Sequence, residues 1–197
     1  MDLKKYIYLK DNFIDDVSYN KFFKWVKNDL PYTKATLLTD EKNKTLVDET
    51  IRKVQECPIN NFPVTEFSMN SLTSVAWYNF FVNRFGNMAY DFYNKYNIKE
   101  QHYDSDMNMQ ILKYEKTNFY IPHYDYHKTA PRHWSFSYII NDNYKGGEFL
   151  FTLHNNENVL IEAKANTCIM FPSNFMYPHT VKEVTDGVRY ALVGWMK

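Results

Sequence analysis

Two short His-Tyr-Asp tripeptides in the sequence have the spacing of metal ligands. They occupy residues 102–104 and 123–125. On a β-strand, residues i and i+2 point to the same side, so the imidazole and the carboxylate of such a tripeptide can reach one ion. Two histidines and one carboxylate on one face of a metal leave further positions open, as in non-haem Fe(II) centres. A tripeptide this short also arises by chance, so its surroundings must decide between the two copies.

The surroundings of the two copies differ. His102 and Asp104 lie in the polar stretch KEQHYDSDM, which is typical of a solvated connector. His123 and Asp125 directly follow an aromatic run with the character of a strand, and Pro122 favours extended backbone there. We therefore predict that His123 and Asp125 are metal ligands and that the other pair lies in a loop.

A third ligand and an anion-binding residue are predicted near the end of the chain. His179 lies in FPSNFMYPHTVKEV, and Arg189 follows ten residues later at the start of an alternating apolar run. Alternation places Arg189 on the same strand face as Trp195. An arginine that faces an apolar barrel is costly unless an anion meets it, and a dicarboxylate could be held by its guanidinium fork. A structural salt bridge with Glu148 or Glu183 is the competing interpretation.

The elements that must position these residues change in character at about residue 106. Before it, the pattern predicts a short strand at 6–9 and helices over 15–28, 39–56 and 71–96, with Pro58 and Pro63 in a loop. After it, period-two runs predict short strands at 107–114, 120–124, 134–140, 148–152, 159–161, 167–171, 180–184 and 188–196. The predicted fold class is α+β. Residues 107–197 form a double-stranded β-helix, or jelly roll, and residues 1–106 form a helical layer packed on it.

Composition excludes several classes of protein. Lys+Arg and Asp+Glu both number 23, and no basic stripe runs along the chain, so we expect no nucleic-acid partner. The two cysteines, Cys57 and Cys168, lie too far apart for a disulfide framework. The first residues lack an apolar secretion signal, and no run is long enough to span a bilayer. We expect a soluble cytoplasmic protein without a membrane partner.

Several ordered segments resemble the prolyl 4-hydroxylases of the 2-oxoglutarate oxygenase superfamily, most of all their bacterial and phage branch. The family pattern is His-x-Asp, then a distal His, then Arg or Lys ten residues on. It is matched here by His123, Asp125, His179 and Arg189. The segments RHWSFSYIIND, NYKGGEFLF, IMFPS and VTDGVRYALVGW also match in order, so the resemblance covers residues 107–196.

The resemblance implies cofactors and a role for each matching residue. Fe(II) would be bound by His123, Asp125 and His179, and 2-oxoglutarate by Arg189 with a hydrogen bond from Tyr114. Oxygen is the further cosubstrate, and ascorbate is an additional candidate cofactor. The implied activity is that of a dioxygenase which hydroxylates a prolyl residue in a peptide or protein and releases succinate and CO2.

The same resemblance implies a substrate site. Trp195 matches an aromatic residue near the target proline, and Arg132 matches an arginine beside the substrate opening. Tyr114 and Trp195 could equally be plain core aromatics. The pair Gly146-Gly147 is interpreted as a tight turn with a close strand approach rather than as a catalytic element.

Departures from the family and rival functions stay open at this stage. Asn118 and Asn166 stand where the family often has glycine, and asparagine tolerates left-handed backbone better than most residues. A free amino acid or another protein side chain could be the substrate. A cupin-like module that binds metal or sugar without turnover would explain the histidines but not Arg189. A halogenase usually lacks the carboxylate, so Asp125 argues against one.

Overall fold

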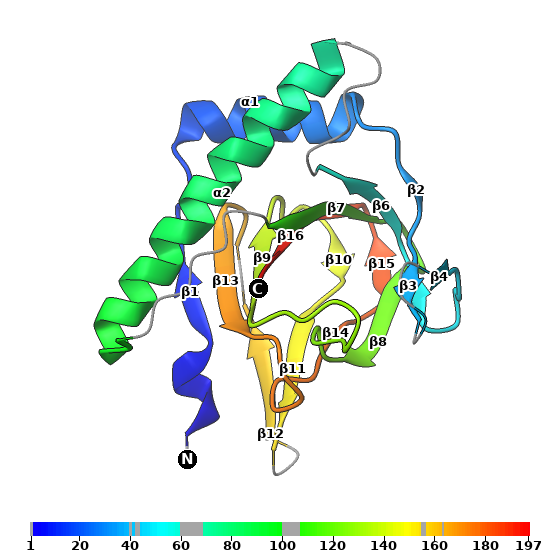
Figure 1. Cartoon of the computed structure of the whole chain (residues 1–197). Helices are drawn as coiled ribbons and strands as arrows, with labels where there is room; N and C mark the ends of the chain where they lie inside the picture. The colour runs from blue at the N-terminus through cyan, green and yellow to red at the C-terminus, as the bar shows by residue number, and fades with distance from the viewer. Residues whose placement is uncertain are drawn as a thin grey trace.

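Two facing β-sheets form the body of the molecule, and two helices cover one of them (Figure 1). The computed structural model describes residues 2–39, 41, 44–59, 69–99, 107–154, 157–162 and 164–197. The larger sheet has the order β1 (Tyr8–Lys10), β13 (Thr167–Pro172), β9 (Trp134–Ile139), β16 (Arg189–Met196), β7 (Asn108–Tyr114), β6 (Gln55–Pro58) and β2 (Thr33–Lys34). The smaller has the order β12 (Glu157–Ile161), β11 (Phe149–Leu153), β14 (His179–Val181), β8 (Phe119–His123) and β5 (Arg52–Lys53). This architecture is the predicted jelly roll.

Two short strand pairs and a single helical turn complete the described elements. β10 (Lys145–Gly146) pairs with β15 (Val184–Asp186), and β3 (Leu37–Leu38) pairs with β4 (Thr45–Leu46) as a small hairpin. A 3-10 turn, Leu3–Tyr6, precedes β1. No helix in the described part of the chain is long and apolar enough to cross a membrane.

Strand β9 explains how one sheet serves both a core and a cavity. Its residues alternate, so Phe136 and Tyr138 point outward to the helices while Ser135 and Ser137 point between the sheets. The outward face carries aromatic bulk, whereas the inward face carries two small polar side chains at Ser135 and Ser137. The interior of the jelly roll therefore keeps room for a ligand.

The helices cover the outward face of the larger sheet. α1 (Asp16–Asn28) is capped at its N-terminus by Asp15, whose carboxylate accepts a hydrogen bond from the Ser18 amide at 2.9 Å. α2 (Met69–Tyr96) crosses above the sheet, where Phe85 stacks on Phe136 with ring centroids 4.6 Å apart. Gly194 permits this approach, since a Cβ there would lie 2.9 Å from the Phe85 ring.

The predicted helix over residues 39–56 is wrong. The described residues of this region form β4, β5 and the start of β6 instead. β6 pairs with β7, and β5 pairs with β8, so the segment completes the edges of both sheets. Unpaired strand edges leave backbone groups without partners, and tertiary pairing therefore outweighs a weak helical periodicity. The predicted strand at 180–184 is also divided between β14 and β15, while Pro63 lies outside the described residues.

The two asparagines that replace glycine behave differently. Asn166 adopts left-handed backbone with φ +63°, as predicted. Its side chain exchanges two hydrogen bonds with the Ile14 backbone, which ties the N-terminal region to the sheet. At the other turn the left-handed residue is Thr117, with φ +68°, rather than Asn118. Asn118 instead accepts a hydrogen bond from the Glu115 amide through its side chain, which closes the same turn.

Candidate active site

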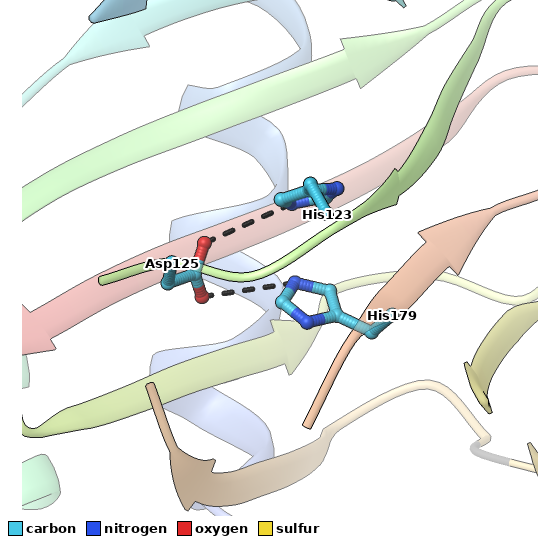
Figure 2. Close-up of side chains that lie close together, drawn as sticks. All are labelled: His123, Asp125 and His179. Carbon is cyan, nitrogen blue, oxygen red and sulfur yellow. Dashed lines mark ion pairs between the residues drawn. The ribbon is translucent and has the colours of Figure 1, made fainter. Parts of the chain in front are cut away.

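Two histidines and an aspartate meet where β8 and β14 run side by side. His123 ends β8, His179 begins β14, and the antiparallel register sets them opposite each other. Each Nε2 lies 3.7 Å from a different carboxylate oxygen of Asp125, which follows β8 directly (Figure 2). One ligand atom from each of the three residues falls within 4.8 Å of the others. A single metal ion can be held by this cluster from one side, as two-histidine, one-carboxylate sites require.

Backbone carbonyls set the tautomers of both histidines. Nδ1 of His123 lies 2.9 Å from the Ile121 oxygen, and Nδ1 of His179 lies 3.1 Å from the Tyr177 oxygen. A carbonyl only accepts, so each Nδ1 is protonated and donates. Each Nε2 therefore keeps its lone pair for a metal, a support that metal-binding histidines commonly have.

The protonation states of the cluster also suit a cation. Burial, followed by the charge of His179, lowers the pKa of His123 to about 3. Burial alone would raise the pKa of Asp125, but His179, His123 and Arg132 outweigh it and lower that pKa to about 2. The Ser135 hydroxyl donates to Asp125 Oδ2 at 2.6 Å and adds to the same effect. At neutral pH the imidazole of His123 is thus neutral and the carboxylate of Asp125 is ionised. These are the states needed for metal coordination.

A cavity of about 330 Å³ extends from this cluster into the space between the sheets, and Arg189 forms part of its wall. Only 1% of Arg189 is exposed, and its guanidinium lies 5.1 Å from the centre of the Tyr114 ring. Among the described residues, no carboxylate pairs with Arg189, and its Nε has no hydrogen-bond partner. The alternative salt bridge with Glu148 or Glu183 is therefore not formed. A buried cation without a partner is costly, so this end of the cavity suits an anion.

The remaining predicted residues line the same cavity. Arg132 stacks on Trp195, with its guanidinium carbon 3.8 Å from the ring centre, and donates to the Asp125 backbone oxygen at 3.2 Å. Tyr114 is buried opposite Arg189, and burial raises the pKa of its phenol, which therefore stays protonated. The structure thus gathers the predicted site residues around one cavity: His123, Asp125, His179, Arg189, Tyr114, Trp195 and Arg132. His102 and Asp104, the rejected pair, lie outside the described residues.

Comparison with known proteins shows which family this part of the chain is similar to. The family model described as the 2OG-Fe(II) oxygenase superfamily matches residues 109–197. The matched part of the chain is similar to that superfamily and contains His123, Asp125 and His179. A PKHD-type hydroxylase of Rippkaea orientalis is 41% identical over 56 residues, which span 28% of this chain and 24% of that relative. The aligned part therefore represents about a quarter of the relative's length.

Solved prolyl hydroxylases share the fold of this chain. A Pseudomonas putida prolyl-4-hydroxylase has a TM-score of 0.67 at 17% identity, covering 98% of this chain and 92% of that one. A Trichoplax adhaerens prolyl hydroxylase in complex with a hypoxia inducible factor peptide fragment has a TM-score of 0.71 at 17% identity, covering 98% and 84%. A viral collagen prolyl hydroxylase of Paramecium Bursaria Chlorella virus-1 has a TM-score of 0.58 at 17% identity, covering 96% and 94%. At these identities the likeness concerns the fold.

The superfamily and the triad imply Fe(II) and 2-oxoglutarate as cofactors. The residues present fit both. Two imidazoles and a carboxylate form the donor set of a non-haem iron site. The unpaired guanidinium of Arg189, in the wall of the same cavity, fits the far carboxylate of a dicarboxylic acid.

The cavity wall also contains a buried charged residue that was not predicted from the sequence. Arg52 on β5 is 7% exposed, lines the cavity and forms a 3.2 Å ion pair with the buried Glu56. Its guanidinium lies 5.1 Å from the centre of Tyr120, whose ring stacks on His123 with centroids 3.5 Å apart. This residue fell within the wrongly predicted helix, where an arginine and a glutamate four positions apart indicate an ordinary surface pair. Only the pairing of β5 with β8 brings it to the site.

Proposed function

We propose that this protein is an Fe(II)- and 2-oxoglutarate-dependent dioxygenase that hydroxylates a prolyl residue in a peptide or protein and releases succinate and CO2. The observation that carries the proposal is one cavity with two different ends. A His-Asp-His cluster lies at one end, and a buried, unpaired Arg189 lies in the wall beyond it. A dicarboxylate that also ligates a metal satisfies both ends at once.

The chain's own residues would bind the metal and the cosubstrate, orient them and exclude water from the cavity. When bound, iron and 2-oxoglutarate supply the oxidative decarboxylation that activates oxygen for hydroxylation. His123, Asp125 and His179 would hold the metal in the wall of the cavity. Ser135 orients the carboxylate of Asp125. Arg189 binds the far carboxylate in a pocket closed to solvent, where a charge-assisted pair is strongest.

The mouth of the cavity supports a substrate that extends beyond it. Leu38 of the β3–β4 hairpin, Ile121, Tyr124 and Tyr126 line the cavity, yet each is more than a third exposed. Exposed apolar side chains that gather at a site favour contact with a larger partner. A free amino acid would leave this rim uncovered, whereas a peptide would pack against it. The Trichoplax adhaerens neighbour, which is in complex with a peptide fragment, supports the same choice.

The test is turnover with defined peptides. Proline-containing peptides and free amino acids are incubated with the protein, Fe(II) and 2-oxoglutarate. Succinate and the gain of one oxygen are then followed by mass spectrometry. We expect a prolyl peptide to gain oxygen and to stimulate succinate release. Asp125→Ala should abolish both, while Asp186→Ala, at an exposed aspartate of β15, should leave them unchanged.

Each failure has a distinct meaning. Equal succinate from wild type and His179→Ala would show that this site is not the source of turnover. Oxygen gain confined to free amino acids would replace the peptide substrate with a small molecule. Binding of 2-oxoglutarate without any succinate would favour a cupin-like binding module.

A further inference from the structure

Ser137 is a buried hydroxyl in the cavity wall that has no hydrogen-bond partner. It lies on β9 with 3% of its surface exposed, and it lines the same cavity as Arg189. Within the described structure its Oγ makes no hydrogen bond. A buried hydroxyl without a partner lowers the stability of a protein, so an unpaired one inside a ligand cavity needs an explanation.

The direction of the Ser137 side chain follows from the alternation of β9. Its chain neighbours Phe136 and Tyr138 belong to the cluster under the helices, so Ser137 faces the opposite way, between the sheets. Its cross-strand partners are Val193 on β16 and Ile169 on β13. Neither side chain can accept a hydrogen bond. The hydroxyl therefore projects into the cavity from an otherwise apolar part of the wall.

Register places Ser137 between the two ends of the cavity. Ser135, two residues earlier, pairs with Trp195 and donates to Asp125 at the metal end. Strands β9 and β16 are antiparallel, and Ser137 pairs with Val193. Ser137 therefore lies closer than Ser135 to the end of β16 that carries Arg189. Any ligand that joins the metal cluster to Arg189 must therefore pass the level of Ser137.

We propose that Ser137 Oγ donates a hydrogen bond to bound 2-oxoglutarate, which makes Ser137 a further cosubstrate-binding residue. This inference rests on the proposed function. At neutral pH, 2-oxoglutarate carries two carboxylates and a ketone, so it offers acceptors only and needs donors from the wall. Ser137 supplies such a donor between the metal cluster and the guanidinium. Because its hydroxyl has no protein partner to give up, the bond forms without breaking another.

The experiment compares two unpaired buried serines. Ser74 on α2 is also buried with no hydrogen-bond partner, but it does not line the cavity. Both variants remove an unpaired buried hydroxyl. Ser137→Ala removes it inside the cavity, and Ser74→Ala removes it away from the cavity. Full-length protein loaded with a redox-inert divalent metal is titrated with 2-oxoglutarate by calorimetry. Thermal unfolding of the metal-free proteins is measured in parallel.

We expect Ser137→Ala to weaken 2-oxoglutarate binding about tenfold, since hydrogen bonds to charged groups are the strong ones. Its Tm without ligand should equal or exceed that of wild type. Ser74→Ala should leave the affinity unchanged. The inference is overturned if Ser137→Ala binds 2-oxoglutarate within twofold of wild type. A lower Tm for Ser137→Ala also overturns it, because the hydroxyl would then have a partner inside the protein. Wild type that fails to bind 2-oxoglutarate at all overturns the proposed function itself.

Discussion

Replacement of Arg189 by methionine should change cosubstrate affinity and protein stability in opposite directions. Arg189 is 1% exposed, and no described carboxylate neutralises it. Its aliphatic stem is held closely, because a Cβ on Gly147 would lie only 3.1 Å from Arg189 Cδ. Methionine keeps the length of this stem but removes the charge. The free protein would thus lose a buried unpaired cation, while the complex would lose its anion partner.

The two effects can be given magnitudes. Removing one partner of a buried charge pair costs about 3–5 kcal/mol, so Arg189→Met should weaken 2-oxoglutarate binding more than about a hundredfold. Arg189→Ala should weaken it to the same degree. Arg189→Lys keeps the charge but loses the fork, and its loss should be moderate. In the cosubstrate-free protein, replacing a buried charge by an apolar residue of similar size should raise the free energy of unfolding by about 1–4 kcal/mol.

The assay separates cosubstrate binding from metal binding and from folding. Calorimetry of the protein loaded with an inert metal measures 2-oxoglutarate affinity, metal titration measures the triad, and chemical denaturation measures stability. Metal affinity should change little in any Arg189 variant. Arg84→Met provides the control, since Arg84 lies over the Phe80 ring on α2 and does not line the cavity. Wild-type affinity for 2-oxoglutarate in Arg189→Met would refute the reasoning. A marked loss of stability would show instead that Arg189 is a structural residue.

Two further predictions concern residues that support the site. Ser135→Ala removes the 2.6 Å hydrogen bond to Asp125 and should lower metal affinity about 10- to 100-fold in a metal titration, with unchanged folding by circular dichroism. Unchanged metal affinity would contradict this. Glu56→Ala leaves Arg52 buried without its ion-pair partner and should lower the free energy of unfolding by about 3–5 kcal/mol in denaturant. Glu49→Ala, from an exposed pair, should cost less than about 1 kcal/mol, and equal losses would disprove the distinction.

Local patterning by itself determined much of this molecule. The longer strands and the helices α1 and α2 are readable from the sequence, because strand and helix periods impose different spacings on apolar residues. These strands are β7, β8, β9, β11, β12, β13 and β16. The candidate metal cluster is equally local in origin. His123 and Asp125 share one short segment, and the context of His179 and Arg189 recurs in a known family. Metal and anion binding need particular side chains at particular spacings, so such sites can be recognised in the sequence.

Other features depend on partners that lie far away along the chain. The apolar spacing of residues 39–56 weakly predicts a helix. In the structure, β5 pairs with β8 and β6 pairs with β7, and this pairing brings Arg52 to the cavity. That Arg189 lacks a counter-ion among the described residues could not be read from the sequence either, because Glu148 and Glu183 were both possible partners. The unpaired hydroxyl of Ser137 is likewise visible only once β13 and β16 have set Ile169 and Val193 beside it. Whether a polar group is satisfied depends on everything packed around it, and only the tertiary structure decides that.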